Sequence, residues 1–227
     1  MVFISSIWIL IMIPSIDYSL YLVISQSDCR GRDVFQVLEQ AVQGGVSLVQ
    51  LREKNMPTRD LVALAKKMKA FLAGHNIPLI INDRVGVALA VDADGVHVGQ
   101  DDMHPLDVRP LIGSNRILGL SINTEEQLRE AQTMPVDYLG IGPVFATQTK
   151  KDSKPVLDVD ELSSMCKKKH VPAVGIGGIN AQNASEVIAA GAEGIAVVSA
   201  ICGADSPQSA AGELKDLITG QLCLRQI

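Results

Sequence analysis

Residues 171–200, VPAVGIGGINAQNASEVIAAGAEGIAVVSA, contain two short apolar runs separated by a segment of helical character. The runs, at residues 172–177 and 194–200, consist almost entirely of Val, Ile, Ala and Gly. Such runs are typical of parallel strands that helices cover on both faces of the sheet. The segment therefore predicts a strand, a crossover helix and a second parallel strand.

The same alternation of apolar runs and helical patterns extends along the rest of the chain. The eight predicted strands lie at residues 19–25, 47–52, 78–83, 95–98, 117–121, 137–142, 172–177 and 194–200. Several of the predicted strands begin with similar short sequences, which are Gly-Gly-Val, Ala-Asp-Gly-Val and Gly-Ala-Glu-Gly-Ile. No long linker divides them, which indicates one domain. Eight such units in about 200 residues predict a single (β/α)8 TIM barrel rather than an open sheet.

Composition narrows the classes of function. The formal charge of −5 gives no general attraction for nucleic acid. The four cysteines show neither metal-ligand spacing nor a disulfide framework, so we expect reduced structural thiols. Small molecules are therefore the expected partners, and the sequence leaves homo-oligomerisation open.

The chain begins with a strongly apolar stretch at residues 2–13. It has no Lys or Arg before the apolar run, and it is far shorter than the ~20 residues that span a bilayer. We predict an N-terminal apolar extension at residues 1–16, a catalytic barrel domain at residues 17–227, no membrane attachment and a cytoplasmic location.

Polar residues gather where the predicted strands end, which is the catalytic face of such barrels. The second strand runs into QLREK (residues 50–54), the third into INDR (residues 81–84), and the fourth into GQDD (residues 99–102). Carboxylates at the ends of adjacent strands can share one Mg2+ ion. We predict a metal site at Asp83 and Asp102, with helix capping by these two side chains as the alternative.

Two further stretches have the character of anion sites. The loop GPVFATQTKK (residues 142–151) combines hydroxyls with two lysines, which suggests an anion-binding lid or else a solvated lysine-rich loop. Glycines after the seventh strand, and the start of the helix after the eighth, let backbone amides approach a phosphate. One site thus suits a diphosphate and the other a monophosphate. A Ser/His/Asp set at strand ends is not evident, and His97, within a strand, is expected to be structural.

In order and spacing, these motifs resemble the thiamine phosphate synthase family, over about residues 18–217. The resemblance rests on residues 50–54, 81–84, 95–102, 142–151, 175–180 and 197–201. It implies an Mg2+-dependent transfer of hydroxymethylpyrimidine from its diphosphate to hydroxyethylthiazole phosphate, with loss of pyrophosphate. The implied catalytic residues are Arg52, Lys54, Ser121 and Lys150, and the implied metal ligands are Asp83 and Asp102. The implied substrate-binding residues are Gln50, Leu51, Arg52, Glu53, Lys54, Asn82, Ser121, Thr147, Gln148, Thr149, Lys150, Gly178, Val198 and Ser199.

Two positions depart from the family's usual pattern. The chain has Ser121-Ile122-Asn123 where members often carry Ser-x-His, and Asp158 where a glycine usually precedes the sixth helix. The nearest rivals are a thiazole tautomerase, which would need a histidine acid/base at the mouth, and a non-catalytic barrel that binds thiazole phosphate and regulates a partner. A general phosphate-binding barrel enzyme would explain the glycines but not residues 50–54.

Overall fold

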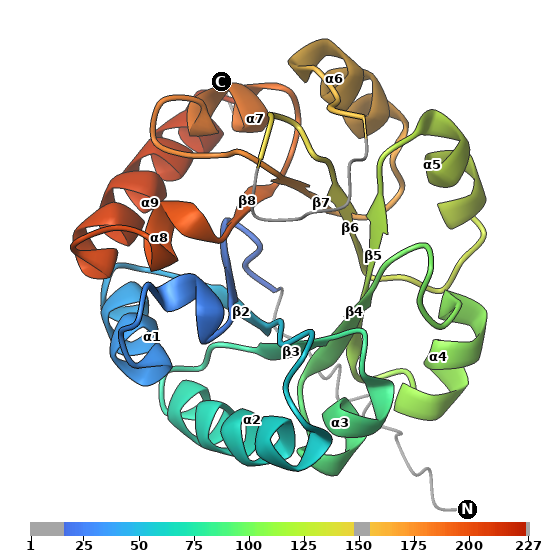
Figure 1. Cartoon of the computed structure of the whole chain (residues 1–227). Coiled ribbons are helices and arrows are strands. Elements are labelled where there is room, and N and C mark those ends of the chain that lie inside the picture. Colours follow the sequence, from blue (N-terminus) through green and yellow to red (C-terminus); the bar gives the residue numbers. More distant parts are fainter. Residues whose placement is uncertain (1–15, 148–154, 226–227) are drawn as a thin grey trace, which may run out of the picture.

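A computed structural model describes residues 16–147 and 155–225, which form a closed barrel of eight parallel strands in the order β1 to β8. Figure 1 looks along the barrel, with the helices in a ring outside the strands. The strands are β1 (Leu20–Ile24), β2 (Leu48–Leu51), β3 (Leu79–Asn82), β4 (Gly95–Val98), β5 (Ile117–Ile122), β6 (Tyr138–Ile141), β7 (Ala173–Ile176) and β8 (Gly194–Val197). The predicted (β/α)8 fold is confirmed.

Helices follow the strands around the barrel. They are α1 (Val34–Gln43), α2 (Thr58–Ala73), α3 (Val85–Ala90), α4 (Pro105–Ile112), α5 (Glu125–Ala131), α6 (Val159–Lys168), α7 (Ala184–Ala189), α8 (Ser199–Cys202) and α9 (Pro207–Leu224), with a 3-10 turn at Ser27–Cys29. The eighth strand ends earlier than predicted, because the backbone turns at Val198 (φ −115°, ψ −80°) and Ser199 already begins α8.

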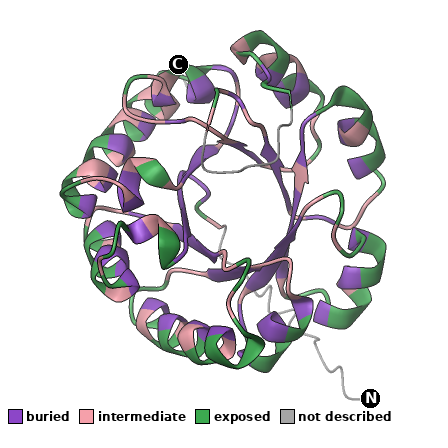
Figure 2. Cartoon of the chain, viewed as in Figure 1, coloured by how far each residue is buried: buried purple, intermediate pink, exposed green. Residues whose placement is uncertain are grey.

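Two apolar layers hold the barrel together, because successive strand residues point to opposite faces. On β1, Tyr21 and Val23 point into the barrel, whereas Leu20, Leu22 and Ile24 pack under the helices. Figure 2 shows strands that are buried almost throughout and helices that are exposed on their outer faces. Ile16, within the predicted extension, packs against the interior layer. Residues 1–15 lie outside the described part of the chain, so the extension stays a prediction.

A hydrogen-bond pair of one kind recurs where the chain enters every second strand. Just before each even-numbered strand, one residue donates its N–H to a carbonyl on the preceding strand, and its side-chain oxygen accepts the N–H of that same partner. The pairs are Ser47 with Leu20, Asp94 with Leu79, Asp137 with Leu118, and Glu193 with Ala173. This hydrogen-bond pair therefore recurs in each quarter of the barrel, at the end opposite the carboxyl ends of the strands.

Asp137→Ala is expected to lower the free energy of unfolding by about 1–3 kcal/mol, because the Leu118 N–H loses its acceptor and Arg109 loses its carboxylate. Urea denaturation measures the change. Glu125→Ala, which removes an exposed ion pair with Lys168, is the matched control and should have a much smaller effect. Equal losses of stability in the two variants would show that the hydrogen-bond pair between Asp137 and Leu118 stabilises the barrel no more than an exposed ion pair does.

In the described residues, no helix has both the length and the apolar character needed to cross a membrane. The cysteines are free thiols, and Cys29, Cys166 and Cys202 are buried while Cys223 is exposed. Burial raises the pKa of Cys166 to about 11. That thiol therefore stays protonated near neutral pH, in keeping with a structural role.

Candidate active site

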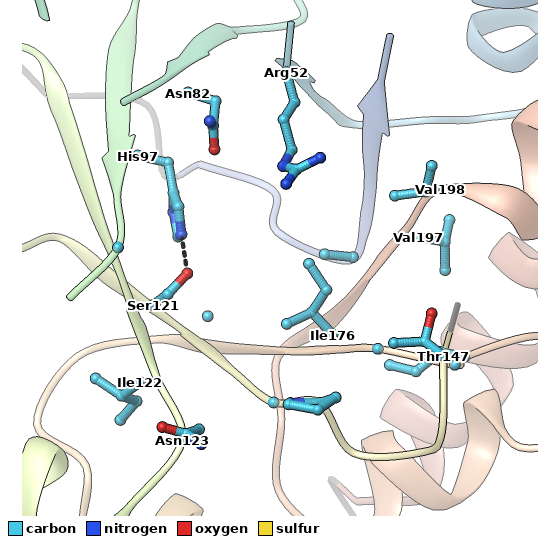
Figure 3. A pocket seen from close by; sticks show the side chains of 18 of the residues that line it. Arg52, Asn82, His97, Ser121, Ile122, Asn123, Thr147, Ile176, Val197 and Val198 are labelled. Atoms are coloured by element: carbon cyan, nitrogen blue, oxygen red, sulfur yellow. Dashed lines mark hydrogen bonds between the residues drawn. The ribbon is translucent and has the colours of Figure 1, made fainter. Parts of the chain in front are cut away.

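A cavity of about 510 Å³ opens at the carboxyl ends of the strands. Figure 3 shows Arg52, Asn82, His97 and Ser121 around it, with Thr147 and Val198 on the far side. The cavity brings together ten of the predicted site residues: Arg52, Lys54, Asn82, Asp83, Asp102, Ser121, Thr147, Gly178, Val198 and Ser199. Sequence motifs that lie far apart along the chain thus meet in one place.

Three predicted residues lie elsewhere. Gln50 lines a smaller cavity of about 30 Å³ deeper in the barrel. Leu51 is buried under the helices, because it alternates with Gln50 and Arg52 along the strand. Glu53 accepts a hydrogen bond of 2.6 Å from the Gln26 N–H and so ties the first two strand-end loops together. The predicted residues Gln148, Thr149 and Lys150 lie outside the described part of the chain.

The acidic side of the cavity centres on Asp83 and Asp102. Asp83 forms an ion pair with Lys54 and has a left-handed backbone (φ 57°), held by a 2.8 Å hydrogen bond from its N–H to the His97 carbonyl. Burial, and then the neighbouring Asp102 carboxyl, raise the pKa of Asp83. Burial also disfavours the ionised form of Asp102, but hydrogen bonds from Asp83 and the Gly99 N–H outweigh it and hold its pKa below the usual range.

Neither carboxylate caps a helix, so the capping alternative is wrong. The residue before α3 is Arg84, which makes no side-chain cap, and α4 is capped by His104. Two neighbouring carboxylates in one cavity are instead oxygen ligands of the kind that Mg2+ prefers. Among residues 16–147 and 155–225, no cluster of three or more His, Cys, Asp or Glu side chains could hold a metal. A pair fits Mg2+, which commonly takes one or two carboxylates plus phosphate oxygens and water.

The opposite side of the cavity is built from backbone at the ends of β6, β7 and β8. Gly177 (φ 99°) and Gly178 (φ 64°) have left-handed backbones that favour glycine. A Cβ at Gly178 would lie 2.6 Å from the Ala146 carbonyl oxygen. The loops after β6 and β7 can therefore touch only because residue 178 has no side chain. Ser199, which begins α8, lines this side of the cavity, and the amide of a first helical residue has no partner within its own helix. This side therefore offers backbone donors suited to a monophosphate.

A buried hydrogen-bond network crosses the barrel beneath the cavity, and we call it the interior network. It joins Gln50, Tyr21, Tyr138, His97 and Ser121 in that order, with distances of 2.7, 2.8, 2.8 and 2.8 Å. The sequence reasoning missed Tyr21 and Tyr138. Their only local signal is a tyrosine inside an otherwise aliphatic strand, in a chain with three tyrosines altogether.

The two departures from the family's usual pattern differ in their surroundings. Asn123 is buried and lines the cavity, so the residue at this position belongs to the site itself. Asp158 begins α6 with a capping box, in which its side chain accepts the Glu161 N–H while the Glu161 side chain accepts the Asp158 N–H. The second departure is therefore a helix-start feature rather than a change in the chemistry.

Comparisons with known proteins identify the family of this chain. A family model described as thiamine monophosphate synthase matches residues 20–201. Thiamine-phosphate synthase of Syntrophomonas wolfei is 46% identical over 202 residues, covering 88% of this chain and 96% of that protein. The enzyme of the same name from Albidiferax ferrireducens is 49% identical over 199 residues, covering 88% and 91%.

Solved structures of other proteins share the fold of this chain. Thiamine phosphate pyrophosphorylase from Pyrococcus furiosus aligns with a TM-score of 0.83 and 35% identity, covering 91% of this chain and 98% of that one. A 3-hexulose-6-phosphate synthase aligns with a TM-score of 0.66 at 16% identity, which shows a shared barrel alone. The family model, the relatives and the Pyrococcus furiosus structure agree, and the chain belongs to the thiamine monophosphate synthase family.

Proposed function

We propose that this protein condenses hydroxymethylpyrimidine diphosphate with hydroxyethylthiazole phosphate to give thiamine phosphate and pyrophosphate. Membership of the family supports this reaction, and so does one feature of the cavity. Arg52 and Lys54 line the same cavity as Gly178 and Ser199. Cations for a diphosphate and backbone donors for a monophosphate thus face one space, as a reaction between two phosphorylated molecules requires.

Mg2+ is the proposed cofactor, with Asp83 and Asp102 as its protein ligands. When bound, it would neutralise negative charge on the diphosphate oxygens. The support for this proposal is the pair of neighbouring carboxylates in the cavity that Arg52 and Lys54 also line.

The reaction breaks the bond between the pyrimidinylmethyl carbon and the diphosphate oxygen, and it forms a bond from the thiazole nitrogen to that carbon. The carbon is benzyl-like, so the pyrimidine ring stabilises positive charge there, and no protein nucleophile is needed. Arg52 and Lys54 are proposed to stabilise the charge that develops on the pyrophosphate. Alignment of the thiazole by the glycine side of the cavity can contribute up to roughly 7–11 kcal/mol in favourable cases.

A thiazole tautomerase fits this cavity less well. Proton transfer there would need an acid/base side chain at the mouth, and Asn123 offers none at the position where a histidine is usual. The nearby His97 has both ring nitrogens in hydrogen bonds, to Tyr138 and Ser121. The cations and the carboxylate pair would also have no task without a diphosphate substrate.

The test of the proposed function is product identity. The purified chain is incubated with both substrates and Mg2+, and the products are identified by mass spectrometry. Thiamine phosphate is expected only when both substrates are present. A folded chain that binds hydroxyethylthiazole phosphate but forms no thiamine phosphate would contradict the proposal and favour the tautomerase or the regulatory barrel.

Lys150→Ala is expected to lower kcat about 10- to 100-fold, with little change in the KM for thiazole phosphate, because the lost cation is proposed to act on the pyrophosphate. Steady-state kinetics with each substrate varied in turn measures this split. Lys167→Ala, on the outer helix α6, is the control and should behave like the unsubstituted protein. A rise confined to the KM for thiazole phosphate would place Lys150 at the other anion site.

A further inference from the structure

The interior network has a direction, because each contact needs one hydrogen and each phenol has only one to give. Gln50 donates from its amide nitrogen to the Tyr21 oxygen. If Tyr21 donates to Tyr138, and Tyr138 donates to Nδ1 of His97, every phenolic hydrogen has an acceptor. His97 then carries its proton on Nε2 and donates it to the Ser121 oxygen. The hydrogen of Ser121 is thereby left to point into the cavity that this residue lines.

The reverse direction is unfavourable. The Tyr21 oxygen would then accept from both Gln50 and Tyr138, and its own hydrogen would find no acceptor within the network. Tyr21 is 1% exposed and Tyr138 is fully buried, so an unpaired hydroxyl here is costly. Burial also raises the pKa of both phenols, which keeps both hydrogens in place. The donor at Gln50 therefore sets the direction of the entire network.

The packing around the network leaves the rings little freedom. His97, Gly119 and Tyr138 are register neighbours on β4, β5 and β6. A Cβ at Gly119 would lie 2.2 Å from the Tyr138 ring and 2.4 Å from His97 Nδ1, so the two rings meet over a glycine. Tyr18 also packs against Tyr138, with ring centroids 5.1 Å apart. The hydrogen-bond geometry is thus held by the barrel wall.

We propose that Tyr21, Tyr138 and His97 are positioning residues that fix Ser121 as a hydrogen-bond donor to the substrate, through the Nε2–H tautomer of His97. The acceptor is an oxygen of the diphosphate, because Ser121 lines the cavity together with Arg52 and Lys54. This choice of acceptor rests on the proposed synthase function. The tautomer of His97, in contrast, does not depend on the identity of the substrate, and it can be measured in the protein without substrate.

The first test is nitrogen NMR of the full chain labelled with 15N-histidine. The chain has four histidines, so His97 can be assigned by its loss in His97→Gln. A protonated Nε2 and an unprotonated Nδ1 are expected, and both Tyr138→Phe and Tyr21→Phe should shift His97 away from this tautomer. A proton on Nδ1 in the unsubstituted protein would overturn the proposal, as would an unchanged spectrum in both variants.

The second test is kinetic. Tyr138→Phe is expected to lower kcat roughly tenfold, with the KM for thiazole phosphate unchanged. On a Ser121→Ala background the same substitution should add less than about twofold, because both variants remove one interaction. Tyr18→Phe, which loses a hydroxyl in the same layer but outside the network, is the control and should keep full activity. Additive losses would contradict action through Ser121. An absence of turnover in the unsubstituted protein would count against the synthase function instead, and would leave the NMR result standing.

Discussion

Asp83→Asn is expected to lower kcat about 10³-fold, equivalent to about 4 kcal/mol of transition-state stabilisation. Asparagine keeps the size of the side chain and tolerates the left-handed backbone at this position, so the barrel should stay folded. The substitution removes a charged oxygen from the proposed magnesium site, and the Mg2+ concentration that gives half-maximal rate should rise as well. Magnesium titrations of pyrophosphate release measure both effects.

The control for this variant is Asp107→Asn. Asp107 is an exposed carboxylate in the first turn of α4 and does not line the cavity, so its loss should leave the magnesium titration unchanged. Thermal melts followed by circular dichroism check that each variant is folded. A folded Asp83→Asn protein with normal rates and a normal magnesium requirement would refute Asp83 as a metal ligand.

Arg52→Ala is expected to lower kcat about 10²- to 10³-fold, a loss of about 3–4 kcal/mol. Arg52 lies where the strand-end cavity meets the smaller one below, and Figure 3 shows its guanidinium projecting into this space. Its five donors suit a diphosphate, and the interaction should strengthen as charge develops on the departing pyrophosphate. Single-turnover rates with saturating substrates report the loss.

Arg52→Lys should recover only part of the rate, because it restores the charge without the planar fork of donors. Arg59→Ala, an exposed arginine on α2, serves as the matched control and should be fully active. If Arg52→Ala changed only the KM for thiazole phosphate, Arg52 would bind the thiazole phosphate and not the diphosphate. That result would contradict its proposed role.

Local sequence patterns predicted the barrel because its strands are covered on both faces and therefore read as continuous apolar runs. The same feature explains the error at the eighth strand, where Val198 continues the apolar run although its backbone has already turned toward α8. Residues 50–54 show a second limit. They read as one continuous binding motif, but the alternation of side chains along a strand points Leu51 away from the cavity, and Glu53 binds the Gln26 amide.

The interior network could not be predicted from local patterns. The contact between Tyr21 and Tyr138 joins residues 117 positions apart and forms only once the barrel has closed. His97 can pack beside Tyr138 only because Gly119 has no side chain. Nothing in the local sequence distinguishes Gly119 from any other glycine in a strand. Polar residues at strand ends are easier to predict, because the barrel fixes which face they share.

The stoichiometry of pyrophosphate release tests the proposed synthase reaction most sharply, when it is measured with both substrates, with each substrate omitted, and with Mg2+ removed by a chelator. One pyrophosphate is expected for each thiamine phosphate formed, and both products should be lost when Mg2+ is removed. Release at an unchanged rate without Mg2+, or no release from a folded protein that binds both substrates, would contradict it.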